Sequence, residues 1–113
     1  MEVSGYHAHV YYNEESFLQA KELVEQAGEK FEVELGRMHK KPVGPHPVWS
    51  CQIAFPPELF GIIVPWLNVN RKGLDVFVHP LTGDDLMDHT ELVMWLGRSY
   101  ALKTEMFSKI ERS

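Results

Sequence analysis

The chain has very little cysteine: Cys51 is the one cysteine among its 113 residues. A single thiol excludes an internal disulfide and a cysteine-based zinc finger. Cys51 lies in an apolar segment, where a lone cysteine is usually a small core residue. Neither a disulfide framework nor a cysteine-ligated metal therefore explains how this chain folds or functions.

Long apolar runs and basic clusters are also missing. The longest apolar stretch, 59–67, is too short to span a bilayer and contains Gly61 and Pro65. Glu2 and the Tyr6-His7 pair interrupt any signal-peptide-like run at the start. The net charge of -5 argues against nucleic acid or an anionic membrane as a partner. We expect a cytoplasmic protein whose residues 1–113 form one domain.

The spacing of apolar residues predicts an α+β fold. Period-two alternation predicts four strands, and helical spacing predicts three helices, in the order β-α-β-β-α-β followed by an extra helix. The predicted strands are 6–12, 31–35, 48–55 and 74–79, and the predicted helices follow Asn13, Pro56 and Asp84. The tail, 103–113, is expected to form a short helix or to fray.

This order of elements is the ferredoxin-like pattern. It predicts the sheet order 4-1-3-2, with strands 1 and 3 parallel and strand 4 antiparallel to strand 1. The helices would cover one face of the sheet. The other face would be free and would pair with a second copy in a dimeric α+β barrel. Tyr11 and Phe77 fall on that free face and favour a homodimer.

Histidine is plentiful, with six residues in the chain. Imidazole is the commonest transition-metal ligand and the usual acid–base group near neutral pH. Alternation along strand 1 places His7 and His9 on the free face, and His79 falls on the same face of strand 4. With strands 1 and 3 parallel, His46 would begin strand 3 at that same end.

Four histidines are therefore predicted to gather, with His7, His46 and His79 at one end of the sheet and His9 one pleat further in. The convergence of histidines from three neighbouring strands on one face favours a metal site. Each histidine taken alone is more often an ordinary, partly buried polar residue, so both interpretations stand at this point.

The motifs that carry these histidines resemble a known family. They are Tyr6-His7-Ala8-His9-Val10-Tyr11-Tyr12, Gly44-Pro45-His46-Pro47, and 78–85 with Asp88-His89. In this order they are similar to the DOPA 4,5-dioxygenase family of fungi and bacteria, over roughly residues 5 to 100. The resemblance implies a ferredoxin-like, commonly dimeric fold and non-haem iron(II). It also implies extradiol opening of a catechol such as L-DOPA with O2.

Given this resemblance, we predict His9, His46 and His79 as ligands of Fe2+, with Zn2+ or another divalent ion as an alternative in the purified protein. We predict His7 and His89 as acid–base or substrate-orienting groups. Strand geometry does not choose between His7 and His9, because both lie on one face.

Three other functions compete with this prediction. A non-catalytic metal- or small-molecule-binding dimer would bind zinc tightly and consume no oxygen with any catechol. A cofactor-free monooxygenase or isomerase on the same barrel would use histidine only as a base and would keep its activity in the presence of chelators. A structural dimerisation module would have a packed, dry histidine-bearing face.

Overall fold

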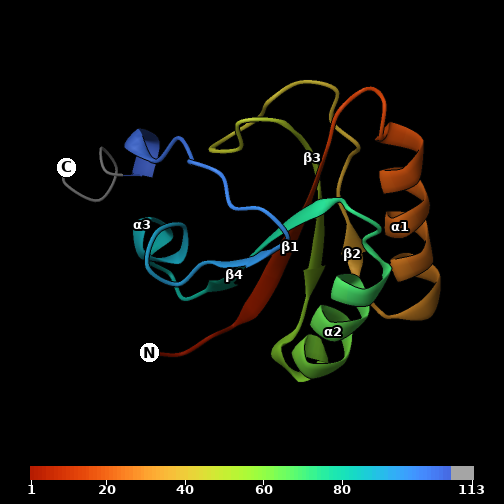
Figure 1. Cartoon of the computed structure of the whole chain (residues 1–113). Coiled ribbons are helices and arrows are strands. Elements are labelled where there is room, and N and C mark those ends of the chain that lie inside the picture. Colours follow the sequence, from red (N-terminus) through yellow and green to blue (C-terminus); the bar gives the residue numbers. More distant parts are fainter. Residues whose placement is uncertain (108–113) are drawn as a thin grey trace.

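The computed structural model describes residues 1–107, which form a five-stranded antiparallel sheet with helices on both faces (Figure 1). The strand order is β2-β3-β1-β4-β5. The strands are β1 (Gly5–Tyr12), β2 (Glu34–Leu35), β3 (Trp49–Phe55), β4 (Asp75–Leu81) and β5 (Met94–Leu96). The helices are α1 (Phe17–Lys30), the 3-10 turn η1 (Pro57–Leu59), α2 (Phe60–Asn70) and the short α3 (Asp85–Asp88).

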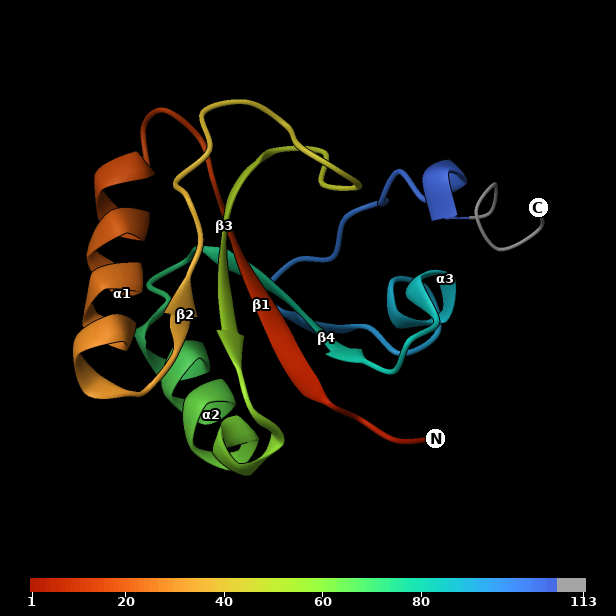
Figure 2. The same ribbon diagram turned by 180° about the vertical axis from the view of Figure 1, so that it is seen from behind.

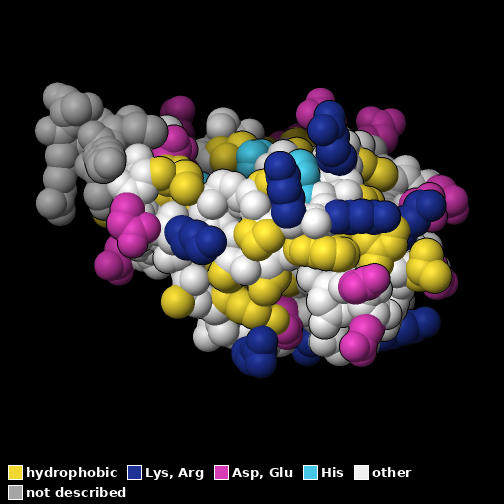
Figure 3. Space-filling model, turned by 90° about the horizontal axis from the view of Figure 1, so that it is seen from above, with side chains coloured by type: hydrophobic (Ala, Val, Ile, Leu, Met, Phe, Trp, Pro, Cys, Tyr) yellow, Lys and Arg dark blue, Asp and Glu magenta, His cyan; other side chains and the backbone are white. Residues whose placement is uncertain are grey.

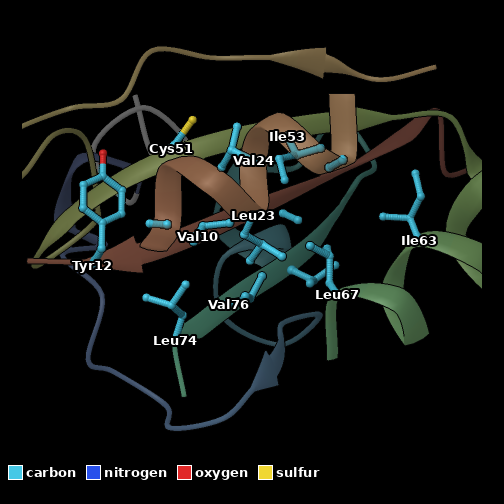
Figure 4. Close-up of a cluster of buried hydrophobic side chains, with 14 of the residues drawn as sticks. Val10, Tyr12, Leu23, Val24, Cys51, Ile53, Ile63, Leu67, Leu74 and Val76 are labelled. Atoms are coloured by element: carbon cyan, nitrogen blue, oxygen red, sulfur yellow. The ribbon is translucent and has the colours of Figure 1, made fainter. Parts of the chain in front are cut away.

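Helices α1 and α2 cover one face of the sheet, and α3 lies on the opposite side (Figures 1 and 2). The hydrophobic core fills the space between the sheet and the two long helices (Figure 4). As the alternation predicts, β1 contributes Ala8 and Val10 to this core, and β4 contributes Val76 and Val78. The buried stripe of α1 is Ala20, Leu23, Val24 and Ala27, at the spacing of an amphipathic helix.

The first helix begins later than the sequence predicts. Asn13 is not its N-cap, because α1 begins at Phe17 and Ser16 precedes it. The side-chain oxygen of Asn13 instead accepts a hydrogen bond from the Ser16 backbone N–H at 3.0 Å. This Asx-type contact stabilises the turn before the helix. In the second long helix, Pro65 is exposed, and the helix continues beyond it to Asn70.

The predicted direction of the third strand is wrong. β3 runs antiparallel to β1, with Trp49 opposite Tyr12 and Phe55 opposite Tyr6. The α1 crossover returns the chain so that β2 runs in the same direction as β1. β3 then pairs antiparallel with β2 and lies between β2 and β1. The predicted antiparallel pairing of strand 4 with strand 1 is confirmed, with His7 opposite His79.

The predicted length of the extra C-terminal helix is also wrong. The side chain of Asp84 caps α3 by accepting a hydrogen bond from Met87 N–H, but the helix ends at Asp88. Residues 94–96 form β5 instead, because the free edge of β4 offers backbone partners and Trp95 stacks on Phe77 at 4.7 Å. In the predicted tail, residues 105–107 are helical, and 108–113 lie outside the described residues.

The sheet face that bears His7, His9, Tyr11, Phe77 and His79, here called the histidine face, is covered rather than free. Tyr11 is 2% exposed and Phe77 is fully buried. The loop 36–48 and the segment 97–107 fold over this face, joined by a hydrogen bond from Lys103 N–H to the Pro45 carbonyl oxygen. The argument for a dimer from an exposed apolar face therefore fails. Within residues 1–107, no helix is long and apolar enough to cross a bilayer.

Candidate metal centre

Three histidines from two adjacent strands converge on the histidine face. His7 and His9 are successive inward positions of β1, and His79 lies opposite His7 on β4. One nitrogen of each ring lies within 4.8 Å of a nitrogen of the other two. Among residues 1–107, this is the one group of three potential metal ligands that are within such reach of one another.

The spacing of two of these rings suits one shared ion. The Nε2 atoms of His9 and His79 are 3.1 Å apart. With metal–nitrogen bonds of about 2.1 Å, two ligands are about 3.0 Å apart at a right angle and about 3.4 Å apart at a tetrahedral angle. The observed separation falls between these limits, so both nitrogens are able to bind the same ion.

The backbone fixes which nitrogen of His79 is available. Nδ1 of His79 lies 2.9 Å from the carbonyl oxygen of Pro80. A carbonyl oxygen accepts only, so Nδ1–H is the donor, and the neutral ring keeps its lone pair on Nε2. Metal-binding histidines commonly donate their second N–H to a carbonyl in this way, which orients the ring.

Burial keeps the clustered imidazoles neutral, as metal ligands must be. Burial lowers the pKa of His79 to about 4, against weaker opposing effects from the Pro80 carbonyl and Asp88. The pKa of His9 lies well below 6.5, because of burial first and the neighbouring imidazoles second. The pKa of His7 is also lowered, by burial and by His89. At neutral pH these rings carry lone pairs, as binding a cation requires.

The structure places His46 beside this group rather than within it. The reversed direction of β3 starts that strand beside Tyr12, away from His7. The loop 36–48 folds back, so that the ring of His46 lies 4.2 Å from the ring of His9. Nδ1 of His46 is 2.7 Å from the hydroxyl oxygen of Tyr11. Burial lowers the pKa of His46 to about 4, with the nearby imidazoles adding to the effect.

His89 also borders the cluster, next to His79. Its ring lies 4.2 Å from the ring of His79 and 4.4 Å from the ring of Phe107. Nδ1–H of His89 donates to the carbonyl oxygen of Asp85 at 2.7 Å. The lone pair of a neutral His89 is therefore on Nε2, and the ring is half-buried. The predicted gathering of His7, His9 and His79, with His89 nearby, is confirmed as an arrangement of side chains, but the predicted place of His46 at the His7 end of the sheet is wrong, because His46 lies against His9 and Tyr11.

A cavity of about 170 Å³ adjoins His9 and His46. It is lined by His9, His39, Val43, Gly44, Pro45, His46, Ser50 and Gln52. His39, a histidine outside the motifs that carry the other five, is half-buried here. The backbone N–H of His39 donates a hydrogen bond to the Ser50 carbonyl oxygen at 3.1 Å. This contact is with a residue distant in sequence, so no local sequence pattern predicts the position of His39. Histidine side chains reach the surface on this side of the molecule (Figure 3).

A larger cavity, of about 320 Å³, lies at the far end of β1. Tyr11, Asp75, Arg98 and Tyr100 are among its lining residues. Asp75 accepts hydrogen bonds there from the Arg98 backbone N–H and the Tyr100 hydroxyl group. The lining includes none of the histidines, so the smaller cavity is the one that adjoins the metal-ligand group.

Carboxylates near the cluster have structural partners of their own. Asp88 is 1% exposed and accepts hydrogen bonds from both the backbone N–H and the hydroxyl group of Thr82. Asp84 caps α3. The donor set is therefore three neutral imidazoles, which fits a divalent transition metal and leaves further coordination positions for small molecules.

Known proteins match this chain along most of its length. Residues 6–106 match the Dopa 4,5-dioxygenase family. A crystal structure from Nostoc punctiforme, described as a "putative dioxygenase", has a TM-score of 0.93 and 46% identity, covering 96% of this chain and 94% of that one.

Two curated relatives are fungal. The DOPA 4,5-dioxygenase of Amanita muscaria is 34% identical over 110 residues, which are 89% of this chain and 48% of that protein. An uncharacterized 21.2 kDa protein of Botryotinia fuckeliana is 33% identical over 120 residues, with 96% and 66% covered. The chain thus spans about half and about two thirds of their lengths. On this evidence, together with the histidine cluster, the chain belongs to the Dopa 4,5-dioxygenase family.

Proposed function

We propose that this protein is a non-haem iron(II) dioxygenase that opens the ring of a catechol, such as L-DOPA, next to the diol with O2. The observation that carries the proposal is the group His7, His9 and His79, whose ring nitrogens lie within 4.8 Å of one another in a member of this family. The substrate class and the extradiol position of cleavage come from family membership.

We assign His7, His9 and His79 as the residues that hold the metal. Of the predicted ligands, His9 and His79 keep that role, and the geometry favours His7 over His46 as the third. An iron(II) ion held by these three residues would supply a site at which a catechol and O2 bind together and exchange electrons. Zinc also suits three imidazoles, so family membership is the ground for choosing iron.

We assign two of the remaining histidines, His46 and His89, to the substrate rather than to the metal. Nε2 of neutral His89 is free to accept a proton, and its ring lies 4.2 Å from that of His79. We assign His89 as the base that takes a catechol hydroxyl proton and later returns one. The cavity beside His9 and His46 has no Lys, Arg, Asp or Glu in its lining, so it suits the uncharged ring of a small aromatic diol.

We also propose a ferredoxin-like fold and a homodimer. The element order β1-α1-β2-β3-α2-β4 and the sheet order β2-β3-β1-β4 support the fold. The homodimer rests on family membership alone, since Tyr11 and Phe77 are covered within the chain. Sedimentation equilibrium of the whole chain tests it, and a monomer at micromolar concentration would contradict it. A cytoplasmic location and the absence of nucleic-acid and membrane partners stay predictions from sequence.

Oxygen uptake by the reconstituted protein tests the proposed function. The chain is loaded anaerobically with Fe2+, then mixed with L-DOPA, caffeate or protocatechuate in aerated buffer. We expect stoichiometric oxygen consumption and a yellow ring-opened product with at least one of the three. Tight zinc binding without oxygen uptake would instead indicate the non-catalytic metal-binding function. Turnover that survives a chelator would indicate cofactor-free catalysis.

A further inference from the structure

Two buried side chains outside the metal-ligand group share a short hydrogen bond. The hydroxyl oxygen of Tyr11 lies 2.7 Å from Nδ1 of His46. Tyr11 is 2% exposed and His46 is 6% exposed. Tyr11 comes from β1 and His46 from the loop 36–48, so the contact ties the loop to the sheet at the edge of the cavity beside His9.

The direction of this hydrogen bond follows from the partners available. Within residues 1–107, His46 is the one hydrogen-bond partner of the Tyr11 hydroxyl group. A donor Nδ1–H would leave the buried hydroxyl hydrogen of Tyr11 without an acceptor. That penalty favours the opposite arrangement, in which the hydroxyl group donates to Nδ1, by on the order of tenfold or more. Neutral His46 then carries its proton on Nε2.

Nε2 of His46 has no partner in the part of the chain that the structure describes. No described residue forms a hydrogen bond with this nitrogen, and no side-chain nitrogen or oxygen of these residues is both buried and unpartnered. Nε2 is therefore accessible, and the cavity that His46 lines lies next to His9. His79 has the opposite tautomer, because its Nδ1 donates to the Pro80 carbonyl. The two histidines thus differ in role: His79 offers a lone pair and His46 offers an N–H.

We propose that Tyr11 is a positioning residue that fixes His46 as an Nε2–H hydrogen-bond donor to an oxygen atom of a bound catechol. The identity of the bound molecule rests on the proposed function, whereas the tautomer of His46 does not.

Nitrogen NMR of the whole, chelator-treated chain tests the tautomer directly. Long-range ¹H–¹⁵N spectra of ¹⁵N-labelled protein at pH 7.5 distinguish a protonated ring nitrogen from an unprotonated one, and H46Q identifies the His46 signals. We expect protonated-type Nε2 and unprotonated-type Nδ1 in the wild type. In Y11F, the population of this tautomer should fall by about tenfold relative to the other, by the penalty given above. Protonated Nδ1 in the wild type, or unchanged signals in Y11F, would overturn the proposal.

Tyr12 offers a matched control. It is a neighbouring buried tyrosine, 4% exposed, whose hydroxyl group donates to the backbone oxygens of His39 and Ser50, and these hydrogen bonds involve no imidazole. Y12F should leave the His46 signals unchanged. This control distinguishes the specific loss of the Tyr11 hydroxyl group from a destabilisation of β1 that removal of any buried hydroxyl group would cause. The same change of tautomer in Y12F would contradict a specific role for Tyr11.

Binding of 4-nitrocatechol to the zinc-loaded protein tests the substrate contact. We expect the ligand to shift the His46 Nε2–H signal, and Y11F to raise its Kd by about tenfold at unchanged zinc content, by the same estimate. An unshifted signal in the presence of bound ligand would overturn the contact. If the ligand binds as expected but iron-loaded protein consumes no oxygen, the proposed function fails while this inference stands.

Discussion

The stability of the metal-free protein should fall steeply below neutral pH, because its buried histidines resist protonation. The pKa values of His46 and His79 are lowered to about 4 in the folded chain, mainly by burial. In the unfolded chain both rings have the ordinary histidine pKa of about 6.5. The unfolded state therefore binds more protons between pH 6.5 and 4. This part of the stability is fully present above pH 6.5 and is lost as the pH falls toward 4.

The size of the effect follows from the pKa values. Between pH 6.5 and pH 5, over about 1.5 pH units, each histidine loses about 2 kcal/mol of stability at about 1.4 kcal/mol per unit. His46 and His79 together then lower the free energy of unfolding by about 4 kcal/mol between pH 8 and pH 5. This is a large share of the 5–15 kcal/mol that is typical of a domain.

Urea unfolding of chelator-treated protein at pH 8 and pH 5 measures this difference. H79Q should reduce the pH dependence by about 2 kcal/mol, because one buried imidazole is gone while those of His46 and His9 remain. Y12F removes a buried hydroxyl group that does not titrate in this range, so it should lower stability equally at both pH values. Equal unfolding free energies of the wild type at pH 8 and pH 5, or full pH dependence in H79Q, would refute the reasoning.

Three further predictions follow from single contacts. H79A should lose bound metal and turnover together, and stoichiometric iron in the purified variant would contradict its role as a ligand. I53A should lower the free energy of unfolding by about 3 kcal/mol, since Ile53 is fully buried in the core, and a loss below 1 kcal/mol by urea unfolding would contradict that packing. D84A should cost about 1 kcal/mol through loss of the hydrogen bond to Met87 N–H, whereas D85A, at an exposed position, should cost less.

Period-two alternation predicted the part of the site that lies on strands. Ala8 and Val10 face the core, so His7 and His9 must face the other way, and the same argument places His79 of β4 on that same face. These predictions succeed because alternation is a property of the strand itself. It holds whichever way a neighbouring strand runs.

The position of His46 was not predictable in the same way. Its loop is held by contacts with residues distant in sequence, namely the Tyr11 hydroxyl group and the Lys103 N–H that bonds to Pro45. The assumed parallel direction of β3 placed His46 at the wrong end of the sheet, although the predicted cluster still formed. Loop 36–48 reaches His9 through tertiary contacts, which a local pattern does not contain.

The sequence does not predict strand β5, because its three residues are too few to show the period-two alternation of a strand. Met94, Trp95 and Leu96 form a strand because the edge of β4 is unpaired and Trp95 stacks on Phe77. The apolar residues after Asp84 also occur at helical spacing, which favours a longer helix than α3, which ends at Asp88. Short edge strands depend on the neighbour that they pair with, so tertiary context decides them.

The central claim, that His7, His9 and His79 hold the metal while His46 does not, is tested most directly by metal content. H7Q and H46Q are reconstituted anaerobically with Fe2+, passed through a desalting column, and analysed for iron per folded chain beside the wild type. The account predicts about one iron per chain in the wild type and in H46Q, and little or none in H7Q. Full iron in H7Q together with its loss in H46Q would contradict the assignment.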